Sequence, residues 1–202
     1  MELSSYLIFF CTGYFILYLL IAFVWPTIRT FKQTGINPVT FGKADNAHDF
    51  IGKWFKILTV LILVSIVFSW FGNTTYSYLI PVTYLQKPVL QVTGAGLAMV
   101  SLIWISIAQQ QMGSAWRIGL DHRNKTPLVQ HGLFSISRNP VFLGMITSLL
   151  GFFFLMPNAL TLVTLISGYL LIQIQIRLEE EFLLKEHAGL YKQYISTVRR
   201  LI

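Results

Sequence analysis

The sequence has few charged residues and almost no cysteine. Asp, Glu, Lys and Arg make up 11% of its 202 residues, whereas soluble domains contain about a quarter. The single cysteine, Cys11, excludes an intrachain disulfide and a zinc site built on paired cysteines. The four histidines show no close ligand spacing either, so we expect no metal site. Hydrophobic residues make up 54% of the chain, which indicates that lipid surrounds most of it.

Long apolar stretches predict helices that cross a membrane, because about 20 apolar residues span a bilayer core. These stretches cover residues 3–24, 55–71, 89–108 and 141–176. The last is too long for one span and is interrupted at Pro157, so we interpret it as a helical hairpin. In 89–108, the small residues Gly94, Gly96 and Ala98 favour close approach of a neighbouring helix. The sequence therefore predicts an all-α integral membrane protein with about five transmembrane helices, including a C-terminal hairpin.

Positive charge is distributed unevenly between the predicted loops. All 15 lysines and arginines except Lys87 follow the first, third or fifth apolar stretch. Short loops rich in these residues stay in the cytoplasm, so we expect the N-terminus outside and the C-terminus inside. The net charge of +7 is dispersed along the borders of apolar helices, which favours attraction to anionic lipids over nucleic-acid binding.

We treat residues 1–202 as a single domain with two functional parts. Residues 1–111 form an N-terminal three-helix part, and residues 112–202 carry most of the polar groups that suit ligand binding. The first polar cluster follows the third apolar stretch and contains Trp116 and Arg117. Taken alone, these two side chains are explained by a position at the membrane interface.

The second polar cluster, which ends in Arg138-Asn139-Pro140, leads into the hairpin. Pro140 suits the first turn of a helix, and Asn139 is a favourable N-cap residue. The free N–H groups of that turn, together with Arg138, would receive an anion such as a carboxylate or phosphate. In isolation, the tripeptide is better explained as an ordinary capped helix start with an arginine that extends toward the membrane interface.

The third polar cluster, Glu179-Glu180-Glu181, follows the hairpin. Negative charge is unfavourable at a helix C-terminus, so the helix must continue or the acids must have a cationic partner. Several downstream residues recur at helical spacing after Glu180, namely Leu183, Leu184, His187, Tyr191 and Tyr194. We therefore expect a cytoplasmic amphipathic helix that lies against the membrane.

In this order, the clusters resemble the membrane-embedded methyltransferases that include isoprenylcysteine carboxyl methyltransferases and phospholipid N-methyltransferases. That family carries Gly-x-x-Trp-Arg, then Leu-Val-x-x-Gly-x-Tyr-x-x-x-Arg-His-Pro-x-Tyr-x-Gly, a hairpin, and Glu-Glu-x-x-Leu followed by Gly, Tyr and Tyr. The resemblance covers roughly the last ninety residues. This sequence departs from the pattern at Phe134, Asn139 and Phe142, which replace Tyr, His and Tyr. The downstream glycine is Gly189, one position late, with Ala188 in its expected place.

The resemblance implies a methyltransferase that uses S-adenosylmethionine. Arg138 and the helix start would bind the cofactor carboxylate, while Glu179 or Glu180 would face its ammonium or sulfonium group. The cofactor-binding residues expected from the resemblance are Leu128, Val129, His131, Gly132, Leu133, Arg138, Asn139, Pro140, Phe142, Glu180 and His187. The expected catalytic residues are Arg138, Glu179 and Glu180, and the expected substrate-binding residues are Trp116, Arg117 and Arg177.

The methyl acceptor implied by the resemblance is lipophilic or membrane-associated. An isoprenylcysteine carboxylate, a phospholipid amine and a thiol all suit such a site, and the sequence does not choose among them. An amine must lose a proton, for which Glu180 or His187 are candidates, whereas a carboxylate or thiolate needs no base. Two alternatives are a non-enzymatic membrane scaffold or lipid-binding protein, and a nicotinamide-dependent membrane reductase.

Overall fold

The structure is a computed structural model that describes residues 4–41, 46–121 and 124–202. In these ranges all regular elements are helical, which confirms the all-α prediction. They are α1 (Ser5–Leu19), the π-helix η1 (Leu20–Val24), α2 (Trp25–Thr34), α3 (Ala47–Trp70), α4 (Asn73–Ser77), the 3-10 turn η2 (Thr83–Leu85), α5 (Pro88–Met112), the 3-10 turns η3 (Gly113–Ala115) and η4 (Gly132–Ser135), α6 (Pro140–Leu155) and α7 (Ala159–Thr197).

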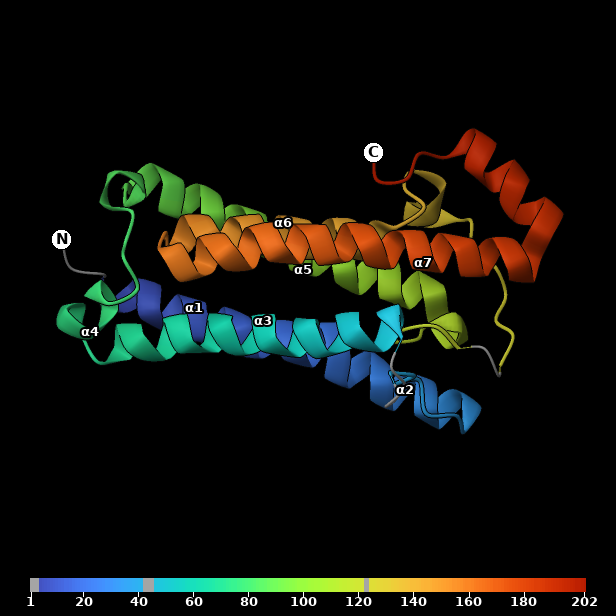
Figure 1. The fold of residues 1–202 in the computed structure, drawn as a ribbon, viewed down its shortest axis with the longest axis horizontal. Coiled ribbons are helices and arrows are strands. Elements are labelled where there is room, and N and C mark those ends of the chain that lie inside the picture. Colours follow the sequence, from blue (N-terminus) through green and yellow to red (C-terminus); the bar gives the residue numbers. More distant parts are fainter. Residues whose placement is uncertain (1–3, 42–45, 122–123) are drawn as a thin grey trace.

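The long helices run alternately between two ends of the molecule (Figure 1). Among the described residues, four helical segments are long and apolar enough to cross a membrane: Ser5–Thr34, Ala47–Trp70, Pro88–Ala115 and Ala159–Thr197. Helix α6 packs against α5 and α7, but its 16 residues are fewer than the roughly 20 that a full span needs. The predicted break in the hairpin is confirmed, because α6 ends at Leu155 and Asn158 caps α7 through Thr161.

Two predicted helix boundaries were wrong. The first helix does not end at Val24 but continues through η1 and α2 to Thr34, with Pro26 in the first turn of α2, where a missing N–H is tolerated. Helix α3 begins at Ala47 rather than at residue 55, because the Asn46 side chain accepts a hydrogen bond from the Asp49 amide and caps it. Both helices therefore extend past the apolar stretches into polar residues.

Helix α7 is longer than a single membrane span requires. Residues 159–187, which precede a break at Ala188, correspond to about 44 Å, whereas a bilayer core is about 30 Å thick. Residues 159–176 carry no charged side chain and are suited to span a membrane, while Arg177 begins an extension that continues to Thr197. The predicted continuation of this helix is therefore confirmed, and its contact with the membrane surface stays a prediction.

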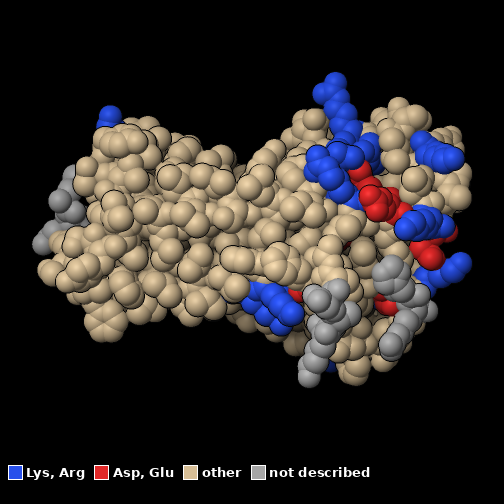
Figure 2. All heavy atoms as spheres, viewed as in Figure 1, with Lys and Arg blue, Asp and Glu red and all other residues tan. Residues whose placement is uncertain are grey.

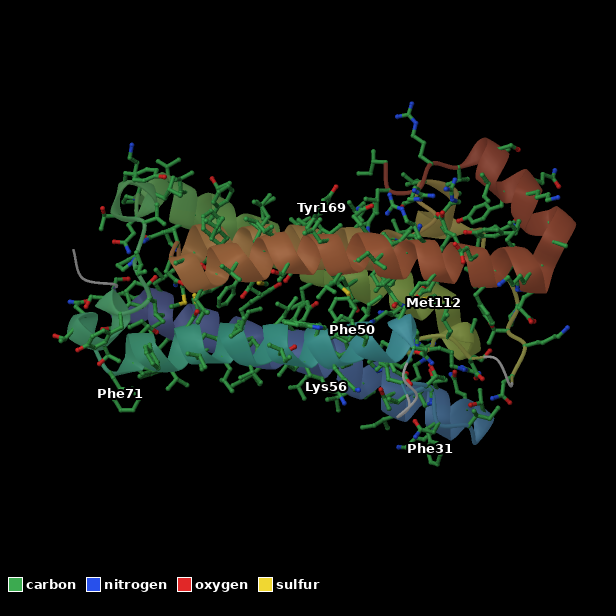
Figure 3. The ribbon with its side chains drawn as sticks, viewed as in Figure 1. Phe31, Phe50, Lys56, Phe71, Met112 and Tyr169 are labelled. Atoms are coloured by element: carbon green, nitrogen blue, oxygen red, sulfur yellow. The ribbon has the colours of Figure 1, made fainter. Side chains whose placement is uncertain are left out.

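Charged side chains gather at one end of the molecule. Figure 2 shows nearly all visible Lys, Arg, Asp and Glu residues at the end that holds the extension of α7, with a long uncharged surface beside it. Phe71 and Tyr169, labelled in Figure 3, are 74% and 46% exposed. An uncharged surface with exposed aromatic side chains suits contact with lipid.

Helices α5 and α6 approach each other through glycine. A Cβ atom on Gly94 would lie 2.7 Å from the carbonyl oxygen of Gly151, and one on Gly151 would lie 2.8 Å from the carbonyl oxygen of Gly94. Ala98 is fully buried in the same region, whereas Gly96 faces open space. The predicted close approach therefore occurs at Gly94 and Ala98 and not at Gly96.

Candidate active site

Arg138 and Glu180 form an ion pair at the charged end of the bundle. Arg138 precedes α6, and its Nε and Nη2 atoms donate to Oε1 of Glu180 on α7 at 3.1 and 3.0 Å. Both side chains are largely buried, with 8% and 10% of their surfaces exposed. Such a two-bond arrangement fixes orientation as well as distance. The pair therefore holds the start of α6 against the extension of α7.

A bend in α7 brings the end of the chain back to this ion pair. The bend lies at Ala188, whose φ of 32° and ψ of −100° are not helical. Beyond it, the Arg200 side chain donates to Oε2 of Glu180 at 2.9 and 2.7 Å. The carbonyl of Val198 accepts from Nη1 of Arg138 at 2.5 Å. Both oxygens of Glu180 are thus bound by guanidinium groups.

The surroundings of Glu180 favour its charged form. Burial by itself raises the pKa of this carboxyl, but the hydrogen bonds and charges of Arg200 and Arg138 outweigh it and hold the pKa below its usual range. Glu180 in turn raises the pKa of Arg200, mainly through their hydrogen bonds. Glu180 therefore remains a carboxylate at neutral pH.

Asn139 occupies the predicted N-cap position of α6, with Pro140 in the first turn, but its side chain makes no capping hydrogen bond. Its Nδ2 atom instead donates to Glu180 at 3.3 Å and to the carbonyl oxygen of Arg200 at 3.0 Å. The expected capping was wrong because these two bonds orient the amide group toward Glu180 and Arg200, and its oxygen accepts no hydrogen bond from the first turn of α6. The N–H groups in the first turn of α6 consequently receive no side-chain cap.

A cavity of about 540 Å³ lies beside the ion pair, among α1, α3, α6 and α7. Its walls are mainly apolar and reach Tyr14, Leu58 and Gly168, within the candidate spanning helices α1, α3 and α7. At the charged end it is lined by seven of the residues predicted to bind ligands or to act in catalysis: Trp116, Arg117, Arg138, Asn139, Pro140, Phe142 and Glu179. These positions are far apart in the sequence, and the fold brings them to one cavity.

Glu179 is the only carboxylate among the described residues that line this cavity. Its Oε1 accepts a hydrogen bond from Nε2 of Gln175, one turn earlier on α7, at 3.0 Å. Glu179 lies beyond the uncharged part of α7, and burial raises its pKa to about 7, while the bond from Gln175 acts in the opposite direction. A carboxyl with such a pKa changes protonation near neutral pH.

The other predicted residues do not line the cavity. They are Leu128, Val129, His131, Gly132, Leu133, Arg177, Glu180 and His187. Gly132, at a φ of 63°, is covered by the side chain of Gln111, which also accepts a hydrogen bond from the Leu133 amide at 2.8 Å. Arg177 is exposed and binds Gln173 on its own helix.

Three residues that the sequence reasoning did not single out contribute to this region. Gln175 could have been predicted from the sequence, because it is a polar residue in an apolar stretch and lies one helical turn before Glu179. Lys56, labelled on α3 in Figure 3, also lines the cavity and borders a predicted span. The role of Arg200 could not have been predicted in this way, because its contact with Glu180 depends on the bend at Ala188.

Residues 89–189 match the family model of phospholipid methyltransferases. The matched range begins in α5 and ends just after the bend in α7, so it includes Arg138, Glu179 and Glu180. No curated protein and no solved structure matches the chain. In the part of the chain that the structure describes, no group of His, Cys, Asp or Glu is arranged to hold a metal ion.

Proposed function

This chain belongs to the phospholipid methyltransferase family, and from that premise we propose that it transfers a methyl group from S-adenosylmethionine to a lipophilic or membrane-associated acceptor. The observation that carries the proposal is the cavity of about 540 Å³, which joins a polar end to walls inside the spanning helices. A water-soluble donor and a lipophilic acceptor would meet where these two environments adjoin.

The residues that line the cavity fit the proposed cofactor. Its volume lies within the roughly 300–1,000 Å³ typical of small-molecule and cofactor sites. Glu179 offers a carboxylate whose only side-chain partner among the described residues is the neutral amide of Gln175, which suits a cationic ligand. The uncapped N–H groups at the start of α6 suit the cofactor carboxylate. Asn139 and Phe142 line the wall between these two groups.

Arg138 and Glu180 receive a different role from the one that the resemblance implied. Because each charge is satisfied by the other and by the end of the chain, neither is available as the main partner of a ligand. We assign them to positioning, since they hold the start of α6 next to Glu179. A small displacement of α6 relative to Glu179 would lower the rate of a reaction that depends on alignment of the reacting atoms.

The cofactor supplies an electrophilic methyl group when it is bound. The chain itself aligns the acceptor atom with that group and keeps water out, which is the main requirement of an in-line displacement. The apolar walls around Phe152 and Ile172 would hold the lipophilic part of the acceptor. Glu179 would attract positively charged groups to the polar end.

We propose that the polar end of the cavity lies on the cytoplasmic side, with the N-terminus outside. The positive-inside rule supports this orientation, because Lys56, Arg117 and Arg138 all line the cavity near its charged end. The gathering of charged side chains at the same end agrees with it (Figure 2).

Isothermal titration of S-adenosylmethionine and S-adenosylhomocysteine into the purified protein in detergent tests the proposal. We expect binding with a micromolar dissociation constant, strongly weakened in Arg138→Ala and Glu180→Ala and unchanged in Glu181→Ala, which alters an exposed residue. Thermal unfolding of each variant separates loss of binding from loss of folding. No binding by well-folded wild-type protein, in detergent and in lipid nanodiscs, would overturn the proposal and favour a lipid-binding scaffold.

A further inference from the structure

We propose that a shallow pocket between α2 and the end of α5 binds the phosphate group of an anionic phospholipid from the surrounding bilayer. The pocket has a volume of about 20 Å³ and is lined by residues of both helices, including Arg29 and Gln110. It is separate from the large cavity, although Gln109 and Trp116 line both. The bound lipid would be a constituent of the membrane and not the methyl acceptor, so this site is independent of the proposed function.

Arg29 offers a positive charge to this pocket. Within residues 4–41, 46–121 and 124–202 it forms no ion pair with an Asp or Glu side chain, whereas Arg117 is paired with Asp121 and Arg138 with Glu180. The Arg29 side chain is partly exposed at the edge of α2. A guanidinium group binds phosphate strongly, because it presents several N–H donors in a fixed planar geometry. Arg29 is therefore suited to hold an anion.

Two neutral polar side chains of α5 contribute to the same pocket. The Nε2 atom of Gln110 donates to Oγ of Ser106, one turn earlier, at 3.2 Å. An amide nitrogen carries two N–H groups, and Gln110 is exposed, so its second N–H can donate to an anion. Among the described residues that line the pocket there is no carboxylate that would repel a phosphate. The pocket thus combines a guanidinium group with an amide donor.

A contact between α5 and the π-helix η1 fixes the position of the pocket. Pro26 has no N–H group to donate to the carbonyl of Ala22, four residues earlier in the chain. The Nε2 atom of the buried Gln109 donates to this carbonyl at 2.7 Å instead. Short π-helices are frequent at functional sites. Because Pro26 and Gln109 both line the pocket, the contact that joins the two helices also places Arg29 and Gln110 around one pocket.

Exposed apolar side chains continue from the pocket along both helices. On the first helix, Leu17 lies two turns before Trp25 and is 46% exposed. On α5, Ile103 lies two turns before Gln110 and is 57% exposed. Trp25 lines the pocket and is 66% exposed, as is typical of tryptophan at a membrane interface. This arrangement suits a phospholipid more than a free anion, because the phosphate would contact Arg29 while the acyl chains contact Leu17 and Ile103.

Native mass spectrometry of the purified protein tests the site with dioleoyl phosphatidylglycerol, which carries a phosphate but no nitrogen and so cannot be an amine acceptor. We expect it to remain bound under conditions that remove zwitterionic dioleoyl phosphatidylcholine. Arg29→Gln should weaken its binding about fivefold or more, the effect of one basic side chain near an anionic membrane surface. Lys53→Gln, which removes an exposed positive charge outside the pocket, is the matched control and should bind as wild type does. Equal retention of the two lipids, or equal losses in the two variants, would overturn the proposal.

Thermal unfolding in detergent distinguishes a phospholipid from a free anion and checks that the variants fold. Dioleoyl phosphatidylglycerol should raise the melting temperature of the wild-type protein, whereas glycerol 3-phosphate at the same concentration should not, because it has no acyl chains. The rise should be smaller in Arg29→Gln and in Gln110→Ala, which removes the amide donor. Equal stabilisation by glycerol 3-phosphate, or an undiminished rise in both variants, would overturn the proposal. Neither result involves S-adenosylmethionine, so failure of this site leaves the proposed function unaffected.

Discussion

Glu179 and Glu180 are neighbours on α7 and lie in opposite electrostatic surroundings. Glu180 is neutralised by Arg138 and Arg200, whereas Glu179 lines the cavity and accepts a hydrogen bond from the neutral side chain of Gln175. Successive residues on a helix point about 100° apart, so adjacent acids face different environments. Glu180 therefore holds the start of α6 against α7, whereas Glu179 is available to a ligand.

Removal of Glu180 should destabilise the protein. Glu180→Ala leaves the largely buried guanidinium of Arg138 without its carboxylate, which usually costs about 3 kcal/mol. We expect a corresponding fall in the free energy of unfolding, measured by denaturation in detergent. Glu181→Ala, which changes an exposed acid on the same turn, should have little effect. Equal effects of the two substitutions would contradict the importance of the ion pair.

A methyl group at Gly94 should separate α5 from α6. The new Cβ of Gly94→Ala would lie 2.7 Å from the carbonyl oxygen of Gly151, and because this obstacle is backbone, we expect a loss of about 1–3 kcal/mol. Gly96→Ala is the matched control, since no atom lies within 4 Å of its added Cβ. Thermal unfolding of both variants tests this, and a harmless Gly94→Ala would show that the helices pack further apart.

A glycine at the bend of α7 should stabilise the protein. Ala188 adopts a φ of 32°, a conformation that side chains disfavour at a cost of roughly 1–3 kcal/mol. Ala188→Gly relieves this strain, and after allowing for the greater freedom of glycine in the unfolded chain, we expect a gain of about 1 kcal/mol. Gly189→Ala, which adds its methyl group in open space, is the control. Lower stability of Ala188→Gly in thermal unfolding would be evidence against the bend.

The stability of the protein should fall as pH rises through the range in which Glu179 ionises. Burial raises the pKa of this carboxyl from 4.5 to about 7, so between these values the folded state binds more protons than the unfolded state, and stability decreases with pH. Glu179→Gln removes this dependence. The melting temperature of the variant minus that of wild type should therefore be larger at pH 8 than at pH 5. A pH-independent difference, as expected for Glu181→Gln, would contradict the raised pKa.

The helices of this protein were largely predictable because apolar length is a local property of the sequence. The break near Pro157 and the continuation of the last helix beyond Arg177 were both predicted and are present. The start of α3 and the end of α2 were missed because they extend into polar residues. In these polar regions, capping by Asn46 decides where α3 begins. The first helix continues because the π-helix η1 leads directly into α2.

The candidate site was predictable only in part. Its residue types and their order in the sequence indicated the family, and seven of the predicted residues share one cavity. The partners of each residue were not predictable. Arg138 and Glu180 were expected to bind opposite parts of a ligand, and they bind each other.

The sequence by itself determined the helical membrane class, the family and the set of polar residues, because these depend on composition, periodicity and motif order. Only the tertiary structure decided which acid of the Glu179-Glu180 pair is neutralised. Arg200 reaches Glu180 through a bend at Ala188, a contact that no local pattern encodes. The charge state of a buried carboxylate depends on the groups that surround it in space, and folding alone brings those groups together.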